Sequence, residues 1–184
     1  LTRIAAVTEK LVPVMACFYL VGGLVMLIAN ITNLPHAFAL IFEGAFNPQA
    51  ILGGAVGIGV REAMRYGVAR GLFSNEAGMG STPHAHAMAK VEKPQDQGVV
   101  AMVCVFIDTF VVLTITALVM ITSGALNVGD MAANPAAENM AQVAFSTVFG
   151  SFGNFYVAIC LLFFAFSTII GWYFFGEQNI KYLF

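Results

Sequence analysis

Charged residues are scarce in this chain. Only 10% of its 184 residues are charged, whereas 59% are hydrophobic and the mean hydropathy is +0.84. A soluble domain carries about 25% charged residues, so this composition excludes a soluble enzyme and a disordered tail. The eight basic residues and a net charge of −2 also leave no basic surface for nucleic-acid phosphates. The composition therefore indicates an integral membrane protein.

The sequence motifs of enzymes and metal sites are also missing. No Walker, GxSxG or HExxH motif is present, so no enzyme class has support. Cys17, Cys104 and Cys160 lie in apolar runs without CxxC spacing, which is typical of small core residues. His84 and His86 are two residues apart and would lie on different faces of a helix, which argues against a metal site. We therefore expect neither an enzyme nor a resident cofactor.

Three apolar segments are long enough to cross a bilayer as helices. They lie at about 11–30, 99–121 and 152–175, and only Asp108 places a charge within one of them. Each has close to the roughly 20 residues that a hydrocarbon core of about 30 Å requires. The chain opens on Leu1 rather than Met and stops shortly after the third segment, so we expect a piece of a larger multi-pass protein.

Basic residues indicate which ends of these segments face the cytoplasm. They lie before the first and second segments and after the third, at Arg3, Lys10, Lys90, Lys93 and Lys181. The connection 122–151 contains neither Lys nor Arg. We therefore expect an external loop at 122–151 and both ends of the chain in the cytoplasm.

The number of crossings must then be even. The first segment runs outward and the second also starts inside, so the chain must cross once more between them. Segment 31–49 has no Lys or Arg and is expected to be a short external interfacial helix. The extra crossing, at about 58–90, holds glycines, amides and charges instead of an apolar run. This pattern predicts a discontinuous helix, which is tolerated at membrane depth where it lines an enclosed cavity and which forms substrate sites in secondary transporters.

Two positions for the break in this crossing stay open, Gly53–Gly59 and Ser74–Gly80. We favour the second, because it leaves a half-helix from Ser81 to Lys90 and a short cytoplasmic turn around Pro94. The arginines of the first half-helix would then have to face an aqueous vestibule or another part of the protein. They are Arg61, Arg65 and Arg70.

Two stretches resemble a known transporter family. Gly67–Ala87, with the sequence GVARGLFSNEAGMGSTPHAHA, resembles the hallmark segment of the alanine or glycine:cation symporters, also called sodium:alanine symporters. Ala165–Glu177, AFSTIIGWYFFGE, resembles a later motif of that family. The resemblance covers essentially the whole chain. It implies an all-α membrane protein, a four-crossing fragment with helices five to eight of an inverted-repeat carrier of the leucine-transporter type, one crossing being discontinuous.

The resemblance also implies a function. It is sodium-coupled symport of small neutral amino acids, such as alanine or glycine, across the plasma (inner) membrane of a bacterium or archaeon. The partners would be the amino acid, sodium, the lipid bilayer and the remaining helices of the carrier. Two alternatives stay open: a non-transporting helical scaffold whose glycines serve helix packing, and a proton-coupled carrier of the same fold. The polar residues of the break favour transport, because packing alone needs neither Asn nor Glu.

The break supplies the expected substrate-binding residues Phe73, Ser74, Asn75 and Gly78. Glycine lets the backbone leave helical geometry, and this frees amides for a carboxylate and carbonyls for sodium. Asn75 both donates and accepts hydrogen bonds, which suits a zwitterion. The simpler interpretations are an ordinary turn between helices and, for Phe73, a packing residue.

The third segment carries the expected ion ligands. The fold that the chain resembles uses a hydroxyl pair on its eighth helix to bind sodium, which implies Ser167 and Thr168 as ligands, and oxygen ligands suit such an ion. Trp172 follows Thr168 by one turn on the same side, and the resemblance implies a pocket wall there. The simpler interpretations are hydroxyls bonded to the preceding turn and an interfacial anchor for Trp172.

The ionisable residues at membrane depth need partners. Asp108 is the one acid within an apolar segment, and such residues are paired or functional. We expect a buried ion pair with one of the arginines, such as Arg70, in preference to proton coupling through Asp108. Glu76, within the break, is a candidate gate residue that pairs with an arginine.

Overall fold

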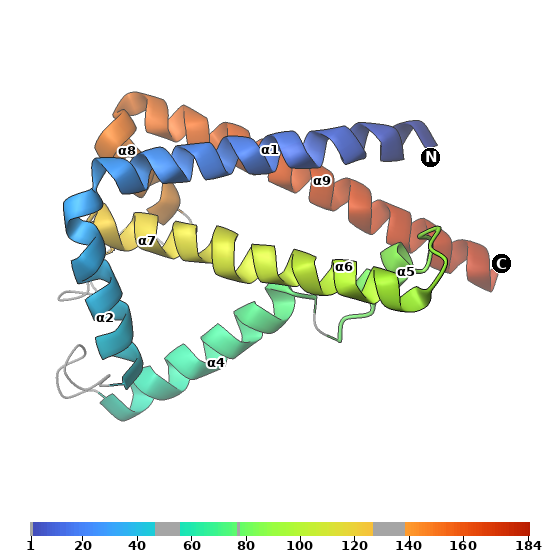
Figure 1. The fold of residues 1–184 in the computed structure, drawn as a ribbon, viewed down its shortest axis with the longest axis horizontal. Coiled ribbons are helices and arrows are strands. Elements are labelled where there is room, and N and C mark those ends of the chain that lie inside the picture. The colour runs from blue at the N-terminus through green and yellow to red at the C-terminus, as the bar shows by residue number, and fades with distance from the viewer. Residues whose placement is uncertain (1, 47–55, 77, 127–138) are drawn as a thin grey trace. The chain divides into compact units, whose positions relative to one another are not determined.

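In the part of the chain that the computed structural model describes, every regular element is a helix (Figure 1). It describes residues 2–46, 56–76, 78–126 and 139–184, with side-chain surroundings for all of these except 2–9, 45 and 56–63. The chain forms two compact units, one of residues 1–42 and 115–184 and the other of residues 43–114. An all-α architecture is therefore confirmed, and the two units are described separately.

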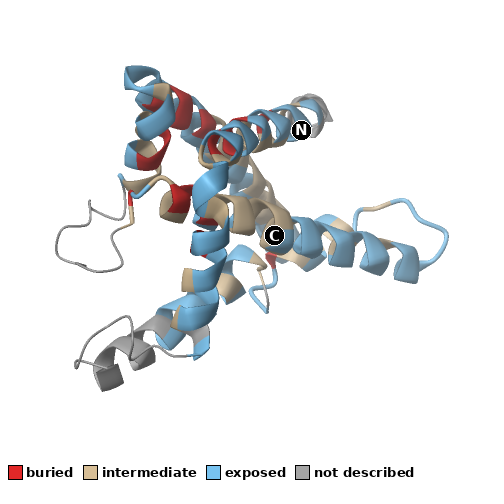
Figure 2. Ribbon diagram, turned by 60° about the vertical axis from the view of Figure 1, so that its left-hand side comes forward, coloured by how far each residue is buried: buried red, intermediate tan, exposed pale blue. Residues whose placement is uncertain are grey.

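The first unit is built around long helices. Its elements are α1 (Thr2–Ala29), the short 3₁₀ turn η1 (Ile31–Asn33), most of α2 (Leu34–Phe46), α7 (Thr114–Thr122), α8 (Met140–Phe149) and α9 (Ser151–Leu183). Apart from Ser81, every residue described as buried belongs to this unit (red in Figure 2). Its core consists of Met26, Val119, Ala125, Ala144, Phe145, Tyr156, Val157 and Cys160.

Glycines allow α1 and α8 to approach α9 closely. A side chain at Gly22 of α1 would overlap the Tyr156 ring of α9, and the Tyr156 hydroxyl donates a hydrogen bond to the Phe18 carbonyl of α1. A Cβ at Gly153 of α9 would lie 2.6 Å from the Ser146 amide nitrogen of α8. Small residues at such contacts are the usual way in which membrane helices pack when lipid offers no hydrophobic advantage.

The segment expected as an external loop contains α8. This helix has ten residues, Met140–Phe149, which is about half of what a crossing needs. Ala144 and Phe145 of α8 are buried against α9, and Gly150, with a φ of 56°, connects the two helices. An apolar helical hairpin therefore lies where the distribution of basic residues indicated only a connection.

The second unit contains the interrupted helix. It comprises α4 (Val56–Ser74), the short α5 (Ser81–His86), α6 (Pro94–Phe106) and the π-helical segment η2 (Ile107–Leu113). Pro94 occupies the first turn of α6, where its missing N–H costs no helical hydrogen bond. The chain then stays helical from Pro94 to Thr122. The second half-helix is shorter than expected, because α5 ends at His86.

Three described helical stretches are long and apolar enough to cross a membrane. They are Lys10–Ala29, Pro94–Thr122 and Ser151–Leu183, and they overlap the three segments expected from the sequence. At about 1.5 Å per residue, the 33 residues of α9 extend about 50 Å, well beyond a hydrocarbon core of about 30 Å. None of the described residues of α6 is buried, as expected for a surface that lipid or further helices cover.

Candidate substrate and ion site

A helix break lies between Ser74 and Ser81, and left-handed backbone forms it. The other expected position, Gly53–Gly59, lies partly outside the described residues. The φ angles are 51° at Glu76, 78° at Gly78 and 87° at Gly80. Glycine adopts this conformation without steric cost, whereas a non-glycine residue such as Glu76 is strained by about 1–2 kcal/mol. Tight turns close the segment, since the Glu76 amide donates to the Phe73 carbonyl (3.1 Å) and the Met79 amide to the Glu76 carbonyl (3.3 Å).

Hydrogen bonds to its carboxylate hold the strained Glu76 in place. Its Oε2 accepts from the Ser81 hydroxyl at 2.6 Å and from the Thr82 hydroxyl at 2.8 Å. Ser81 is the one residue of the second unit that is described as buried. The carboxylate therefore ties the break to the start of α5. In this conformation Glu76 is engaged by hydroxyls of its own segment instead of by an arginine.

Two side chains at the start of the break bind η2. The Ser74 hydroxyl donates to Oδ2 of Asp108 at 2.7 Å. The Thr109 hydroxyl donates to Oδ1 of Asn75 at 3.0 Å. Two consecutive residues of the break thus meet two consecutive residues of the π-helical segment. Helical segments of this kind occur frequently at functional sites.

The two described arginines of α4 form no ion pair with a described acid. Arg65 and Arg70 are exposed, and among the described side chains the ion pair formed is Lys181–Glu177 (2.6 Å) on α9. The Arg61 side chain lies outside the described part of the chain. In the structure Asp108 is therefore hydrogen-bonded to Ser74 instead of paired with Arg70.

The hydroxyl pair of α9 is bonded to its own helix. The Ser167 hydroxyl donates to the Phe164 carbonyl at 2.9 Å and lies 3.8 Å from the Met15 sulfur of α1. The Thr168 hydroxyl donates to the same carbonyl at 2.8 Å. A hydroxyl that donates its proton keeps its oxygen lone pairs as acceptors. The two oxygens therefore stay available to a small hard cation.

The two aromatic residues expected at the pocket are both accessible. Trp172 of α9 is 46% exposed and packs edge-on against Phe175, with ring centroids 6.0 Å apart. Phe73, in the last turn of α4, is 60% exposed. Phe73, Ser74, Asn75 and Gly78 are contributed by the second unit, whereas Ser167, Thr168 and Trp172 belong to the first.

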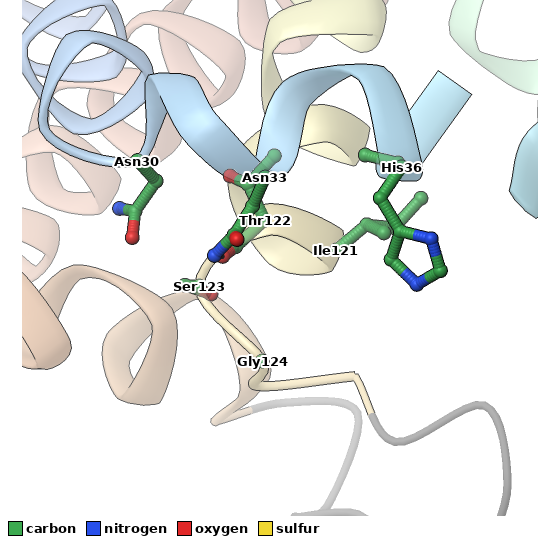
Figure 3. Close-up of a pocket in the computed structure, with 8 residues that line it drawn as sticks. Asn30, Asn33, His36, Ile121, Thr122, Ser123 and Gly124 are labelled. Atoms are coloured by element: carbon green, nitrogen blue, oxygen red, sulfur yellow. Dashed lines mark hydrogen bonds between the residues drawn. The ribbon is translucent and has the colours of Figure 1, made fainter. Parts of the chain in front are cut away.

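A polar pocket of about 290 Å³ lies within the first unit, and none of the expected site residues lines it (Figure 3). It forms where the chain leaves α1 and where α7 ends, and the Asn33 side chain donates to the Thr122 carbonyl there (3.2 Å). Its lining consists of Asn30, Asn33, His36, Ala37, Ile121, Thr122, Ser123 and Gly124. Amide, hydroxyl and imidazole side chains line it together with the apolar Ala37 and Ile121, and none of the eight residues is acidic.

Three residues of the break region were not expected from the sequence. Thr109 was hidden because a single Thr next to Asp108 is ordinary in an apolar helix. Ser81 and Thr82 follow the break directly, and they bind a carboxylate five and six residues before them, which no helix-start motif predicts.

Comparison with known proteins places the whole chain in one family. A sequence model described as the sodium:alanine symporter family matches residues 1–184. An "Uncharacterized transporter" of Haemophilus influenzae is 44% identical over 182 residues, which is 98% of this chain and 39% of that protein.

Two further relatives have descriptive names. The "Sodium/proton-dependent alanine carrier protein" of Bacillus sp. (strain PS3) is 38% identical, over 98% of this chain and 42% of that protein. The "Sodium/alanine symporter AgcS" of Methanococcus maripaludis is 41% identical, over 98% of this chain and 38% of that protein. The chain therefore spans about two-fifths of the length of the curated relatives that it matches.

Proposed function

Because this chain belongs to the sodium:alanine symporter family, we propose that the full-length protein couples the uptake of small neutral amino acids, such as alanine or glycine, to sodium entry. The chain is part of a multi-pass membrane transporter and not of an enzyme. We assign it to helices five to eight of an inverted-repeat carrier of the leucine-transporter type. The interrupted helix α4–α5 would be the discontinuous crossing of the plasma membrane, the second of the four along the chain.

The observation that carries this proposal is the break at Ser74–Gly80. Its backbone is left-handed at Glu76, Gly78 and Gly80, so the helical hydrogen-bond ladder is interrupted. Amides and carbonyls at such an interruption bind the charged groups of substrates in secondary transporters. Ser74 and Asn75 add side-chain polarity, and the exposed ring of Phe73 would close the site against a small side chain.

Ser167 and Thr168 are proposed as sodium ligands. Both hydroxyls already donate to the Phe164 carbonyl, so each oxygen presents lone pairs and no proton to a cation. Trp172, one turn further along α9, would form a wall of the amino-acid pocket. A non-transporting scaffold would need neither the strained break nor the hydroxyl pair.

Uptake of radiolabelled alanine into proteoliposomes containing the full-length carrier tests the proposal. We expect uptake with an inward sodium gradient and none with an equal choline gradient. Equal uptake with the sodium and the choline gradient would contradict sodium coupling. No uptake of any small neutral amino acid would favour the non-transporting scaffold.

A proton is the second candidate for the coupling ion. The name of the Bacillus sp. (strain PS3) relative mentions both sodium and protons. Asp108 is an ionisable group within a helix long enough to span the membrane. An inward proton gradient without sodium therefore forms a third arm of the experiment. Uptake driven by that gradient alone would assign the coupling to protons.

A further inference from the structure

The hydrogen bonds between the break and η2 determine which donor and acceptor groups of Ser74 and Asn75 stay available to a ligand. Asp108, as a carboxylate, is an acceptor only, so the Ser74 hydroxyl must donate to it. The Thr109 hydroxyl donates to Oδ1 of Asn75. Ser74 therefore already uses its donor, and Asn75 already uses its acceptor oxygen.

The remaining roles are complementary to an amino-acid zwitterion. With its proton on Asp108, the Ser74 oxygen offers only lone pairs to a ligand, as an α-ammonium group requires. With its oxygen bound by Thr109, the Asn75 amide offers its NH₂ group, as an α-carboxylate requires. Hydrogen bonds to charged ligand groups are about twice as strong as neutral ones.

We propose that Asp108 and Thr109 are positioning residues for substrate recognition. Asp108 holds Ser74 as the acceptor for the ammonium group, and Thr109 holds Asn75 as the donor to the carboxylate. This inference rests on the proposed function, because it takes the break as the amino-acid site. It adds residues of a different helix that set the specificity for a free α-carboxylate.

Two consecutive residues of η2 act together at the break. Consecutive side chains of a helix point in different directions, so they do not normally reach the same partner segment. In η2, Asp108 and Thr109 both reach the break, one to each of two consecutive residues. A change of helical register in this segment would separate at least one of the two pairs.

The test compares Thr109→Val with Thr109→Ser in the full-length carrier. Val has nearly the shape of Thr but no hydroxyl, whereas Ser keeps the hydroxyl. Alanine half-saturation is measured together with inhibition by alaninamide, in which a neutral amide replaces the carboxylate. In Thr109→Val the Asn75 amide is free to turn and to accept from alaninamide. We expect the preference for alanine over alaninamide to fall about fivefold, the factor for one net hydrogen bond, and Thr109→Ser to restore it.

Three results would overturn the inference while wild-type alanine uptake is intact. The first is a lower maximal rate in Thr109→Val with unchanged half-saturation and preference, which indicates a packing role. The second is equal impairment of Thr109→Ser and Thr109→Val. The third comes from a double-mutant cycle of Ser74→Ala and Asp108→Leu, which decides the matter even if Thr109→Val fails to reach the membrane. Leu has nearly the shape of Asp but no acceptor for the Ser74 hydroxyl, so we expect Asp108→Leu to weaken alanine binding only when Ser74 is present, and additive losses would contradict this. A wild-type carrier without alanine uptake would instead overturn the proposed function.

Discussion

At the scale of single residues, the break relies on backbone that only particular residues adopt easily. Gly78 and Gly80 have φ angles of 78° and 87°, and a Cβ at either position would meet no described atom within 4 Å. Glycine is therefore required there by conformation and not by crowding within the described chain. The Glu76 carboxylate holds the same conformation through Ser81 and Thr82.

Substitutions at Gly78 distinguish a requirement for left-handed backbone from a requirement for space beside a bound ligand. Asn tolerates left-handed backbone better than Ala does, although its side chain is larger. If backbone conformation limits transport, Gly78→Asn will retain more alanine uptake than Gly78→Ala, and Gly78→Leu will abolish uptake while the carrier still inserts. Uptake per surface-expressed carrier is the measurement. The reverse order of Asn and Ala would show that the ligand approaches this Cα closely, and normal uptake by Gly78→Leu would move the site elsewhere.

Thr168 and Trp172 are predicted to divide their roles along α9. Thr168→Ala should raise the sodium concentration for half-maximal uptake, while alanine affinity at saturating sodium changes less, since linkage between sites is limited to about 1–3 kcal/mol. Thr168→Ser keeps the hydroxyl and serves as the control. Trp172→Ala should mainly weaken alanine and favour larger amino acids. Paired sodium and alanine titrations check this, and equal shifts of both curves would leave Thr168 as a hydroxyl bonded to Phe164.

At the scale of elements, the first unit depends on helices that touch through glycine. Gly22 of α1 lies against the Tyr156 ring of α9, and Gly153 of α9 lies against the backbone of α8. The hydrogen bond between the Tyr19 and Thr116 hydroxyls (2.5 Å) links α1 to α7. These contacts support the helix that carries Ser167 and Thr168, so stability and the proposed ion site share one element.

Gly153→Ala is predicted to destabilise the carrier. The added Cβ would lie 2.6–2.8 Å from backbone atoms of Phe145 and Ser146, which cannot rotate away as a side chain can. Overpacking of this kind costs about 1–3 kcal/mol. Thermal denaturation of the full-length carrier in detergent should show a lower midpoint, whereas Gly176→Ala, on the same helix with open space around it, should not. Equal midpoints for the two variants would contradict the close α8–α9 contact.

The sequence was informative about elements with a strong local signal. Apolar runs of about 20 residues predict the long helices, and the two glycines after Asn75 predict the break. Helix α8 was missed because its ten residues are too few to cross a bilayer, and only its packing, with Phe145 buried against α9, reveals it. The bonds from Asp108 and Thr109 to the break join residues 34 positions apart, so tertiary structure alone reveals them. The α5 half-helix was predicted too long because nothing local in Ala87–Lys90 opposes a helix.

At the scale of the whole molecule, the chain is part of a larger carrier. It spans about two-fifths of its curated relatives, and the apolar surface of α6 is exposed along its described length. The remaining helices and lipid would cover this surface. The proposed substrate-binding residues of the break belong to one unit, and the proposed sodium ligands belong to the other.

The orientation of the carrier in the membrane is a separate prediction. Basic residues favour the cytoplasm, so Cys introduced at the exposed Lys93 should react with a membrane-impermeant maleimide only after the cells are permeabilised. Cys at the exposed Asn139, in the connection without Lys or Arg, should react in intact cells. Labelling of Asn139→Cys only in permeabilised cells would show that this connection is cytoplasmic. The reason for expecting a fourth crossing would then be lost.

Alanine-driven sodium movement tests the central claim, coupling of the two solutes, most directly. Proteoliposomes with the full-length carrier are loaded with alanine and with equal ²²Na⁺ on both sides, and then diluted into alanine-free buffer. The account predicts net ²²Na⁺ efflux that follows the alanine gradient and disappears in the Thr168→Ala variant at sodium concentrations well below its half-saturation. Alanine efflux without ²²Na⁺ movement in the wild-type carrier would contradict it.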